Sequence, residues 1–195
     1  SDGVYLYKQC DLTLKKEFHD PVVRYARLPY LAMTREGRPG LWAGLNAGGV
    51  AFVAADAYTN RTYETPDAAV NALFNAYESS IANATSARDA ADALEHFYLA
   101  GYLNALFPGP DIALFADAKQ AIFIEFTPGP NNHNPIREVV VNRGFFASTN
   151  HFRVQPEYPC GEPRIVGSLP TAYLVRNGEG ITLGGGISRP ASRPG

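Results

Sequence analysis

The chain has 195 residues and few of the features that mark several common classes of protein. Its two cysteines, Cys10 and Cys160, are in a chain of this size more often free and buried than paired. Its four histidines are scattered, so no Cys and His set has the spacing of a zinc site. No Walker loop is present, and we expect neither a metal nor an organic cofactor.

Charge and hydropathy exclude two further kinds of partner. The formal net charge is −2, and no basic cluster indicates binding to nucleic acid or to an anionic membrane. No apolar run approaches the roughly 20 residues that span a bilayer. No signal peptide is recognisable, although one could have been removed, and a cytoplasmic location is slightly favoured.

What the chain does have is enough apolar sequence for one buried core. With 46% hydrophobic residues, a chain of this length predicts one domain and not two. We assign residues 1–187 to that domain and residues 188–195 to a loose tail.

Strand-like and helical segments follow one another in separate runs. Residues 41–45 and 50–54 bracket a glycine-rich turn and predict a β-hairpin. Two helices should follow, the first opened by Thr65-Pro66-Asp67 and the second by a capping pair, Ser86 with Asp89.

The second half of the chain returns to strands. We predict strands at 112–115, 121–126 and 139–146, and a weaker helical stretch at 169–175. Runs of strands, then helices, then strands are typical of an α+β fold with an antiparallel sheet.

The polar cluster of residues 147–152, Ala-Ser-Thr-Asn-His-Phe, ends the last of these predicted strands. An Asn amide at a strand end is one of the standard donors to a developing oxyanion. Asn150 is therefore a candidate catalytic residue, and its alternative role is to start a turn.

Four segments, in this order, carry a resemblance to a known family. They are Asp2-Gly-Val-Tyr-Leu-Tyr-Lys-Gln-Cys-Asp11, Gly44-Leu-Asn-Ala-Gly-Gly-Val50, Ala113-Leu-Phe-Ala-Asp117 with Ala121-Ile-Phe-Ile-Glu125, and Ser148-Thr-Asn-His-Phe152. The set resembles the N-terminal nucleophile hydrolases, in the branch of choloylglycine hydrolase, penicillin V acylase and the acyl-coenzyme A:6-aminopenicillanic acid acyltransferases. In that branch the segments read DG…(F/L)GRNxD, GMNExGL, LLAD…viE and TNHF.

The resemblance implies a four-layer αββα sandwich, in which two antiparallel sheets pack between layers of helices. It also implies attack on an amide or related acyl bond by the side chain of the first residue, whose free α-amine acts as the base. Such an amine titrates near 7.7–8.0, close to working pH, so no histidine is needed.

Carried over by motif, Asn150 donates to the oxyanion and Asp11 orients the α-amine. Lys8 stands where the family usually has Arg. The exchange weakens the expectation of an identical role, because Lys lacks the planar guanidinium. Arg164 could match a late arginine of the family. Asn46 is more simply a turn residue than a catalytic one.

The nucleophile has three interpretations. If Asp2–Asp11 is the family's second strand, the strand that carries its Cys nucleophile is missing from this chain. If Ser1 is the nucleophile, Asp20 has about the usual spacing for the acid and the match of Lys8 and Asp11 is a coincidence. Cys10 is the third candidate and is not terminal.

The sequence therefore predicts an amide-bond hydrolase or acyltransferase of N-terminal nucleophile type. Its partner would be a small molecule with an acyl or amide group, and whether the chain forms a homo-oligomer is left open. The alternative is a non-hydrolytic relative that binds a small molecule or closes a ring, and Lys8 and Gln9 in place of Arg and Asn favour it.

Overall fold

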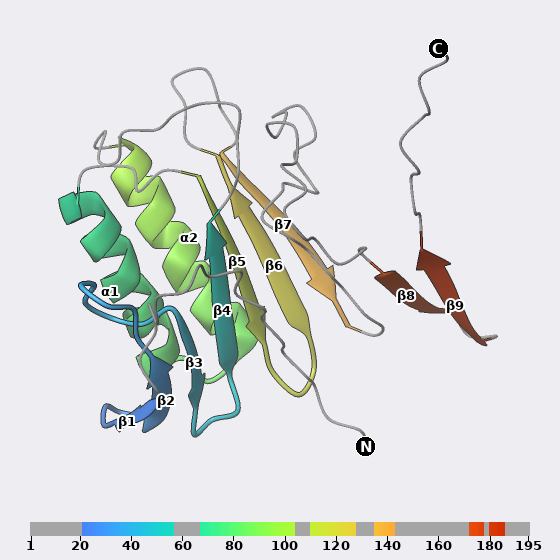
Figure 1. The fold of residues 1–195 in the computed structure, drawn as a ribbon, viewed down its shortest axis with the longest axis horizontal. Helices are drawn as coiled ribbons and strands as arrows, with labels where there is room; N and C mark the ends of the chain where they lie inside the picture. Colours follow the sequence, from blue (N-terminus) through green and yellow to red (C-terminus); the bar gives the residue numbers. More distant parts are fainter. Residues whose placement is uncertain are drawn as a thin grey trace, which may run out of the picture.

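The computed structural model describes residues 21–56, 67–103, 110–127, 135–142, 172–177 and 180–185. Seven antiparallel strands form one sheet in chain order, from β1 to β7 (Figure 1). The strands are β1 Val22–Arg24, β2 Tyr30–Met33, β3 Ala43–Asn46, β4 Ala51–Asp56, β5 Asp111–Ala116, β6 Ala121–Phe126 and β7 Ile136–Val141. Two helices, α1 Asp67–Asn83 and α2 Ala87–Leu103, are inserted between β4 and β5.

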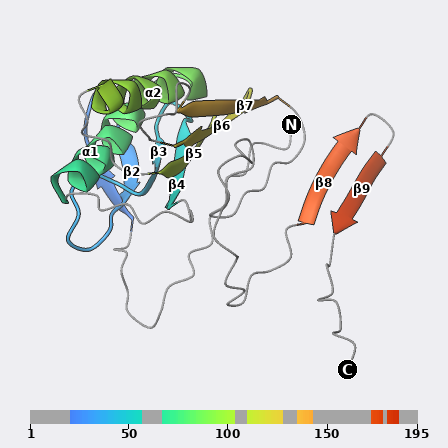
Figure 2. The ribbon, with the colours of Figure 1, turned by 90° about the horizontal axis from the view of Figure 1, so that it is seen from above.

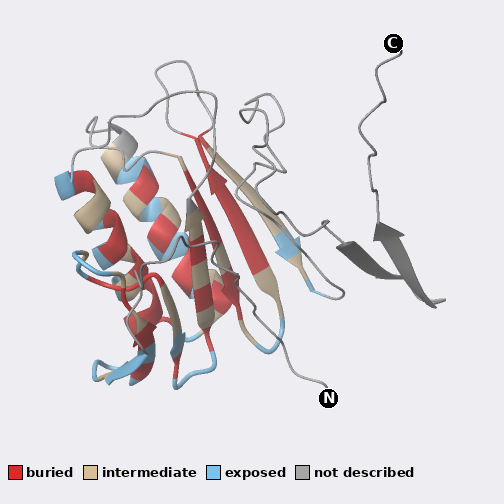
Figure 3. Ribbon diagram, in the orientation of Figure 1, coloured by how far each residue is buried: buried red, intermediate tan, exposed pale blue. Residues whose placement is uncertain are grey.

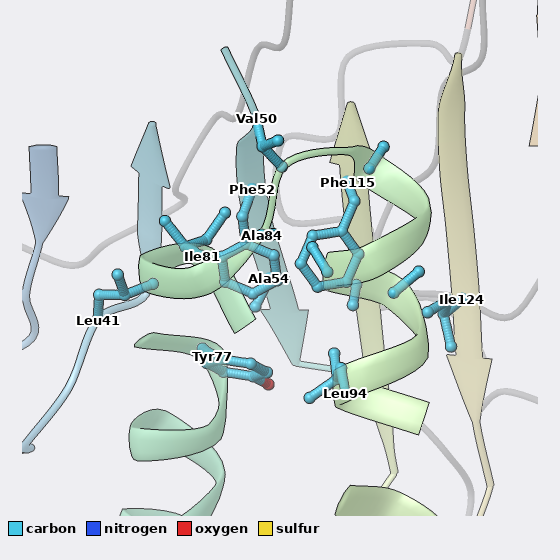
Figure 4. Packing of buried hydrophobic residues seen from close by; sticks show 14 of the residues in the cluster. Leu41, Val50, Phe52, Ala54, Tyr77, Ile81, Ala84, Leu94, Phe115 and Ile124 are labelled. Carbon is cyan, nitrogen blue, oxygen red and sulfur yellow. The ribbon is translucent and has the colours of Figure 1, made fainter. Parts of the chain in front are cut away.

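Both helices lie on the same face of the sheet (Figure 2). Their buried side chains meet those of the sheet in one hydrophobic core, in which Phe52 of β4 lies between Tyr77 of α1 and Phe115 of β5 (Figure 4). The ring centroid of Phe52 is 4.8 Å from the ring centroid of each neighbour, within the range that aromatic pairs prefer. Trp42 also belongs to this core.

The order of elements confirms the α+β prediction. The 41–54 hairpin is present as β3 and β4, and its turn includes Gly49 at φ 82°. The second helix begins as its capping pair predicts, because the Asp89 N–H donates to Ser86 Oγ at 3.1 Å. The Asp89 carboxylate accepts from the N–H and the hydroxyl of Thr85, and bonds from Thr85 first and Ser86 second lower its pKa.

Two sequence interpretations differ from the structure. Strands β1 and β2 were not predicted, because each is short and lies among Pro21, Pro29 and the turn at 38–40. The helical stretch at 169–175 is wrong where it is described, since β8 Ala172–Asn177 pairs with β9 Gly180–Gly185 as an antiparallel hairpin. The Tyr-Leu-Val run of β8 suits a strand at least as well as a helix. Pairing with β9 stabilises the strand.

The described residues contain a two-layer unit, one seven-stranded sheet with helices on one face, and the separate hairpin of β8 and β9. The four-layer sandwich therefore stays a prediction. The boundaries 1–187 and 188–195 stay predictions too, because the tail lies outside the described residues.

Gly40 lets the segment before β3 pass close to helix α1. Its φ is 68°, and a Cβ added there would lie 2.1 Å from the Phe74 carbonyl oxygen. Gly37 has the same backbone conformation, with φ 69°, but a Cβ there would meet nothing within 4 Å.

Replacing Gly40 with Ala should lower the free energy of unfolding by about 3 kcal/mol, from backbone strain and displacement of α1 together. Gly37→Ala is the matched control and should cost about 1 kcal/mol, from strain alone. Urea denaturation of both variants measures the difference. Equal costs would mean that the Gly40 segment does not pack on the helix as described.

Candidate functional site

Every residue that the sequence places in the catalytic site lies outside the described residues. This holds for Ser1, Lys8, Asp11, Asn150 and Arg164. It holds also for the two alternatives, Asp20 and Cys10. Their predicted roles stay predictions, and most of the described residues lie between them in the sequence.

The face of the sheet turned away from α1 and α2 is apolar. Strand pairing places its residues in cross-strand rows, and one row runs Val139, Phe123, Leu114 and Val53 across β7, β6, β5 and β4. Phe123 is only 1% exposed, although it is not among the residues that pack with the helices. Ile112 of β5, on the same face, is buried too, and Figure 3 colours most of β5 and β6 as buried.

The same face becomes more open toward β1. Val23, Leu31 and Leu45 are neighbours in a second row, and they are 54%, 43% and 44% exposed. The face also holds one fully buried acid, Glu125, whose cross-strand neighbour is Arg137. A buried carboxylate needs polar partners, and Glu125 does make polar contacts.

Asn46, in the segment resembling the family's hairpin, has a structural role. Its amide donates at 2.8 Å to the carbonyls of Ile81 and Ala84, at the end of α1, and its oxygen accepts from the Val50 N–H at 3.0 Å. The side chain is 3% exposed. One amide thus satisfies carbonyls that a helix end leaves without partners and closes the β3–β4 turn.

Asp117, in the segment resembling LLAD, also serves the fold. Its carboxylate accepts from the N–H groups of Ala87, at the start of α2, and of Lys119 and Gln120, in the β5–β6 turn. Burial alone would raise the pKa of this carboxyl, but the three backbone donors together hold it below its ordinary value. Asp117 therefore joins helix α2 to the β5–β6 turn.

In the core, Asp111 accepts hydrogen bonds from tyrosines of both helices. Its Oδ2 accepts from the hydroxyls of Tyr77, at 2.5 Å, and of Tyr98. All three side chains are buried. Burial, with the adjacent Asp111 charge, raises the pKa of Tyr98 well above its ordinary value, so this hydroxyl stays protonated and donating.

A third polar cluster joins helix α2 to strand β7. The Arg88 guanidinium makes two bonds to the Glu138 carboxylate, at 2.5 and 2.6 Å, and one to Asp92 at 3.1 Å. The Glu95 side chain also hydrogen-bonds Glu138, while its Oε1 is buried without a hydrogen-bond partner. Burial, together with Glu138, raises the pKa of Glu95 to about 7. Bonds from Arg88 lower the pKa of Glu138.

Near the other end of the sheet, Glu78 of α1 accepts from Arg24 at 2.5 Å and from Tyr30. The pKa of Arg24 is raised, chiefly by its bond to Glu78, and the pKa of Tyr30 is raised by burial and by Glu78. Each of the two edge strands therefore has an Arg–Glu pair that connects it to a helix.

Sequence reasoning missed both of these edge clusters. Their one local signal is the pair Arg88 and Asp92, four residues apart on a helix. Glu78 and Glu138 are separated from their arginines by 54 and 50 residues, so only the fold brings them together. Among the described residues no group of His, Cys, Asp and Glu side chains could hold a metal ion. No helix in these segments is long and apolar enough to cross a membrane.

Comparison with known proteins finds similarity among solved structures. No family model matches the chain, and no curated protein matches it. Among solved structures, penicillin V acylase from Agrobacterium tumefaciens is similar with a TM-score of 0.33 and 14% sequence identity. The similarity covers 60% of this chain and 33% of that chain, so the chain spans about a third of that protein's length.

Changing Asn46 to Asp should destabilise the protein by about 3 kcal/mol, because a carboxylate cannot donate to the two helix-end carbonyls and would be buried beside them. Asn83→Asp is the matched control. The Asn83 amide makes an exposed bond to the Ser79 carbonyl at the same end of α1. It should cost only a few tenths of a kcal/mol. Thermal and urea unfolding measure both, and equal costs would contradict the structural role of Asn46.

Proposed function

We propose that the chain is an amide-bond hydrolase or acyltransferase that uses an N-terminal nucleophile. The observation that carries the proposal is the set of four segments in family order, ending on Asn150. Two of these segments fall on strands that are close in the described sheet, β3 with β4 and β5 with β6. Their place in one antiparallel sheet supports the proposal, because the resemblance implies antiparallel sheets.

The second face of the sheet also supports the proposal. Its apolar rows call for a further layer, because apolar side chains on a sheet face are stabilised by burial away from water. A second sheet packed there would make the four-layer sandwich. The polar residues of the described scaffold are largely used within the fold, so the chemistry would come from the segments that carry Ser1 and Asn150.

In the proposed reaction the Ser1 hydroxyl attacks the carbonyl carbon of the substrate amide. The α-amine takes the hydroxyl proton and passes it to the leaving amine as the C–N bond breaks. Asn150 donates to the oxyanion, and Asp11, or Asp20 in the other alignment, orients the α-amine. Water, or another acceptor in a transferase, then attacks the acyl ester and regenerates Ser1.

A non-hydrolytic relative of the same fold is the second candidate. Lys8 and Gln9, where the family has Arg and Asn, favour it, since Lys cannot bind a carboxylate in the bidentate manner of Arg. This candidate would form no acyl-enzyme and would not need a free α-amine at residue 1.

The test is to express the uninterrupted native gene, sequence the mature N-terminus, and incubate the protein with a panel of N-acyl amides. Intact mass should show an acyl adduct on residue 1, and Asn150→Ala should reduce turnover by roughly 100-fold or more. Asn142→Ala, an exposed asparagine just after β7, should leave turnover unchanged.

Three outcomes separate the alternatives. A mature Ser1 with an adduct supports the nucleophile as proposed. A longer chain with a Cys at its mature start moves the nucleophile to that Cys and restores the alignment of Lys8 and Asp11. Full turnover in Asn150→Ala, or no adduct with any N-acyl amide, would contradict the hydrolase proposal and favour the second candidate.

A further inference from the structure

Strand β7 is the last strand of the seven-stranded sheet and has a single strand neighbour, β6, among the described residues. Its helix-facing side chains are Ile136, Glu138 and Val140, by strand pairing with the helix-facing side chains of β6. Ile136 packs against the core, and Val140 is 41% exposed. The contact between β7 and helix α2 therefore depends strongly on Glu138.

Glu138 is contacted by two groups of α2 that lie on the same face of the helix, about two turns apart. Arg88 binds both of its oxygens, and Glu95, seven residues further along the helix, adds a carboxyl. Two carboxylates in hydrogen-bond contact repel each other unless they share a proton. The geometry thus needs a proton on the pair, and Arg88 holds the negative charge on Glu138.

We propose that Glu95 and Glu138 form a proton-dependent latch that fastens β7 to α2 and is closed when Glu95 is protonated. In the closed state the Glu95 carboxyl donates to Glu138, which accepts from Arg88 at the same time. Loss of the proton leaves two adjacent carboxylates and a nearby Asp92 facing one guanidinium. Repulsion then weakens the attachment of β7.

The groups around Glu95 support a latch that weakens when Glu95 loses its proton. Besides Glu138 of β7, the charged or titratable groups that act on it are Arg88, Asp92 and Tyr98 of α2. From β5, Asp111 is bound to Tyr98, and α1 contributes the hydroxyl of Tyr77 to that same Asp111. The helix-facing residues of β6 are apolar and offer no compensating cation: Ile122, Ile124 and Phe126.

The pH range in which the latch is closed follows from the linkage between protonation and folding. The pKa of Glu95 is raised from 4.5 to about 7, so the folded protein holds this proton more tightly than the unfolded chain does. The stabilising effect of this proton is complete below about pH 4.5 and is lost as the pH rises through about 7. The latch therefore opens on the alkaline side of neutrality.

Strand β7 ends at Val141, nine residues before Asn150 in the sequence. It is therefore the described strand that most closely precedes the candidate oxyanion donor along the chain. The latch itself does not depend on the proposed function, and its test uses no substrate.

The experiment follows the wild type and Glu95→Gln by thermal unfolding and by hydrogen exchange between pH 5 and pH 9. Gln keeps a donor to Glu138 but does not titrate. We expect the wild type to lose about 2–4 °C in Tm relative to Glu95→Gln as the pH rises through 7. Exchange in residues 136–141, corrected for intrinsic rates, should accelerate with pH in the wild type more than in the variant.

Glu36→Gln is the matched control, because it makes the same chemical change at an exposed position in the turn after β2. It should follow the wild-type pH profile. If Glu95→Gln also parallels the wild type, the latch is disproved. Should the variant fail to fold, a carbon NMR titration of Glu95 in the wild type decides: a midpoint near 7 supports the latch, and one near 4.5 overturns it.

Discussion

The structure depends on one constraint, a sheet that is apolar on both faces while both described helices cover the same face. On the helix side, the core closes around Phe52, Tyr77 and Phe115 (Figure 4). On the other side Phe123 and Ile112 are buried although they do not belong to that core. Burying apolar area is the main favourable term in folding, so a sheet of this composition favours layers on both sides.

Polar residues in the described scaffold mostly serve to hold the layers together. Asn46 joins the end of α1 to the β3–β4 turn, Asp117 joins the start of α2 to the β5–β6 turn, and Asp111 joins both helices to β5. Each is a buried or half-buried group whose bonding capacity is met by several donors or acceptors, as burial requires. A motif residue can therefore match a family pattern and still act through the fold.

The central architecture could be predicted from sequence because its signals are local. The β3–β4 hairpin was indicated by a glycine-rich turn between apolar runs, and α2 by Ser86 with Asp89 at its start. Strands β1 and β2 gave no such signal, because three or four residues between turn-formers are too short to show a period. Their pairing with β3 comes from the tertiary structure.

The site divides in the same way. Asn150 stands out in the sequence as an amide where a strand is predicted to end. That local pattern is enough to suggest its role as an oxyanion donor. Arg88 and Glu138 are 50 residues apart and give no joint signal, since each is an ordinary surface charge until α2 lies across the sheet. Sequence periodicity reports burial, whereas long-range ion pairs depend on the register of strands and the rotation of helices.

The carboxyl pair also shows why an edge strand can be the adjustable part of a rigid sheet. A central strand such as β5 has two strand neighbours and apolar contacts on both faces, so one lost side-chain bond changes its attachment little. Strand β7 has one described neighbour, and Glu138 supplies its polar contact with a helix. Local stability is lowest where few buried contacts hold a segment, so a single proton has its largest structural effect there. A titrating pair placed at β7 can therefore change the attachment of this strand while the core around Phe52 stays intact.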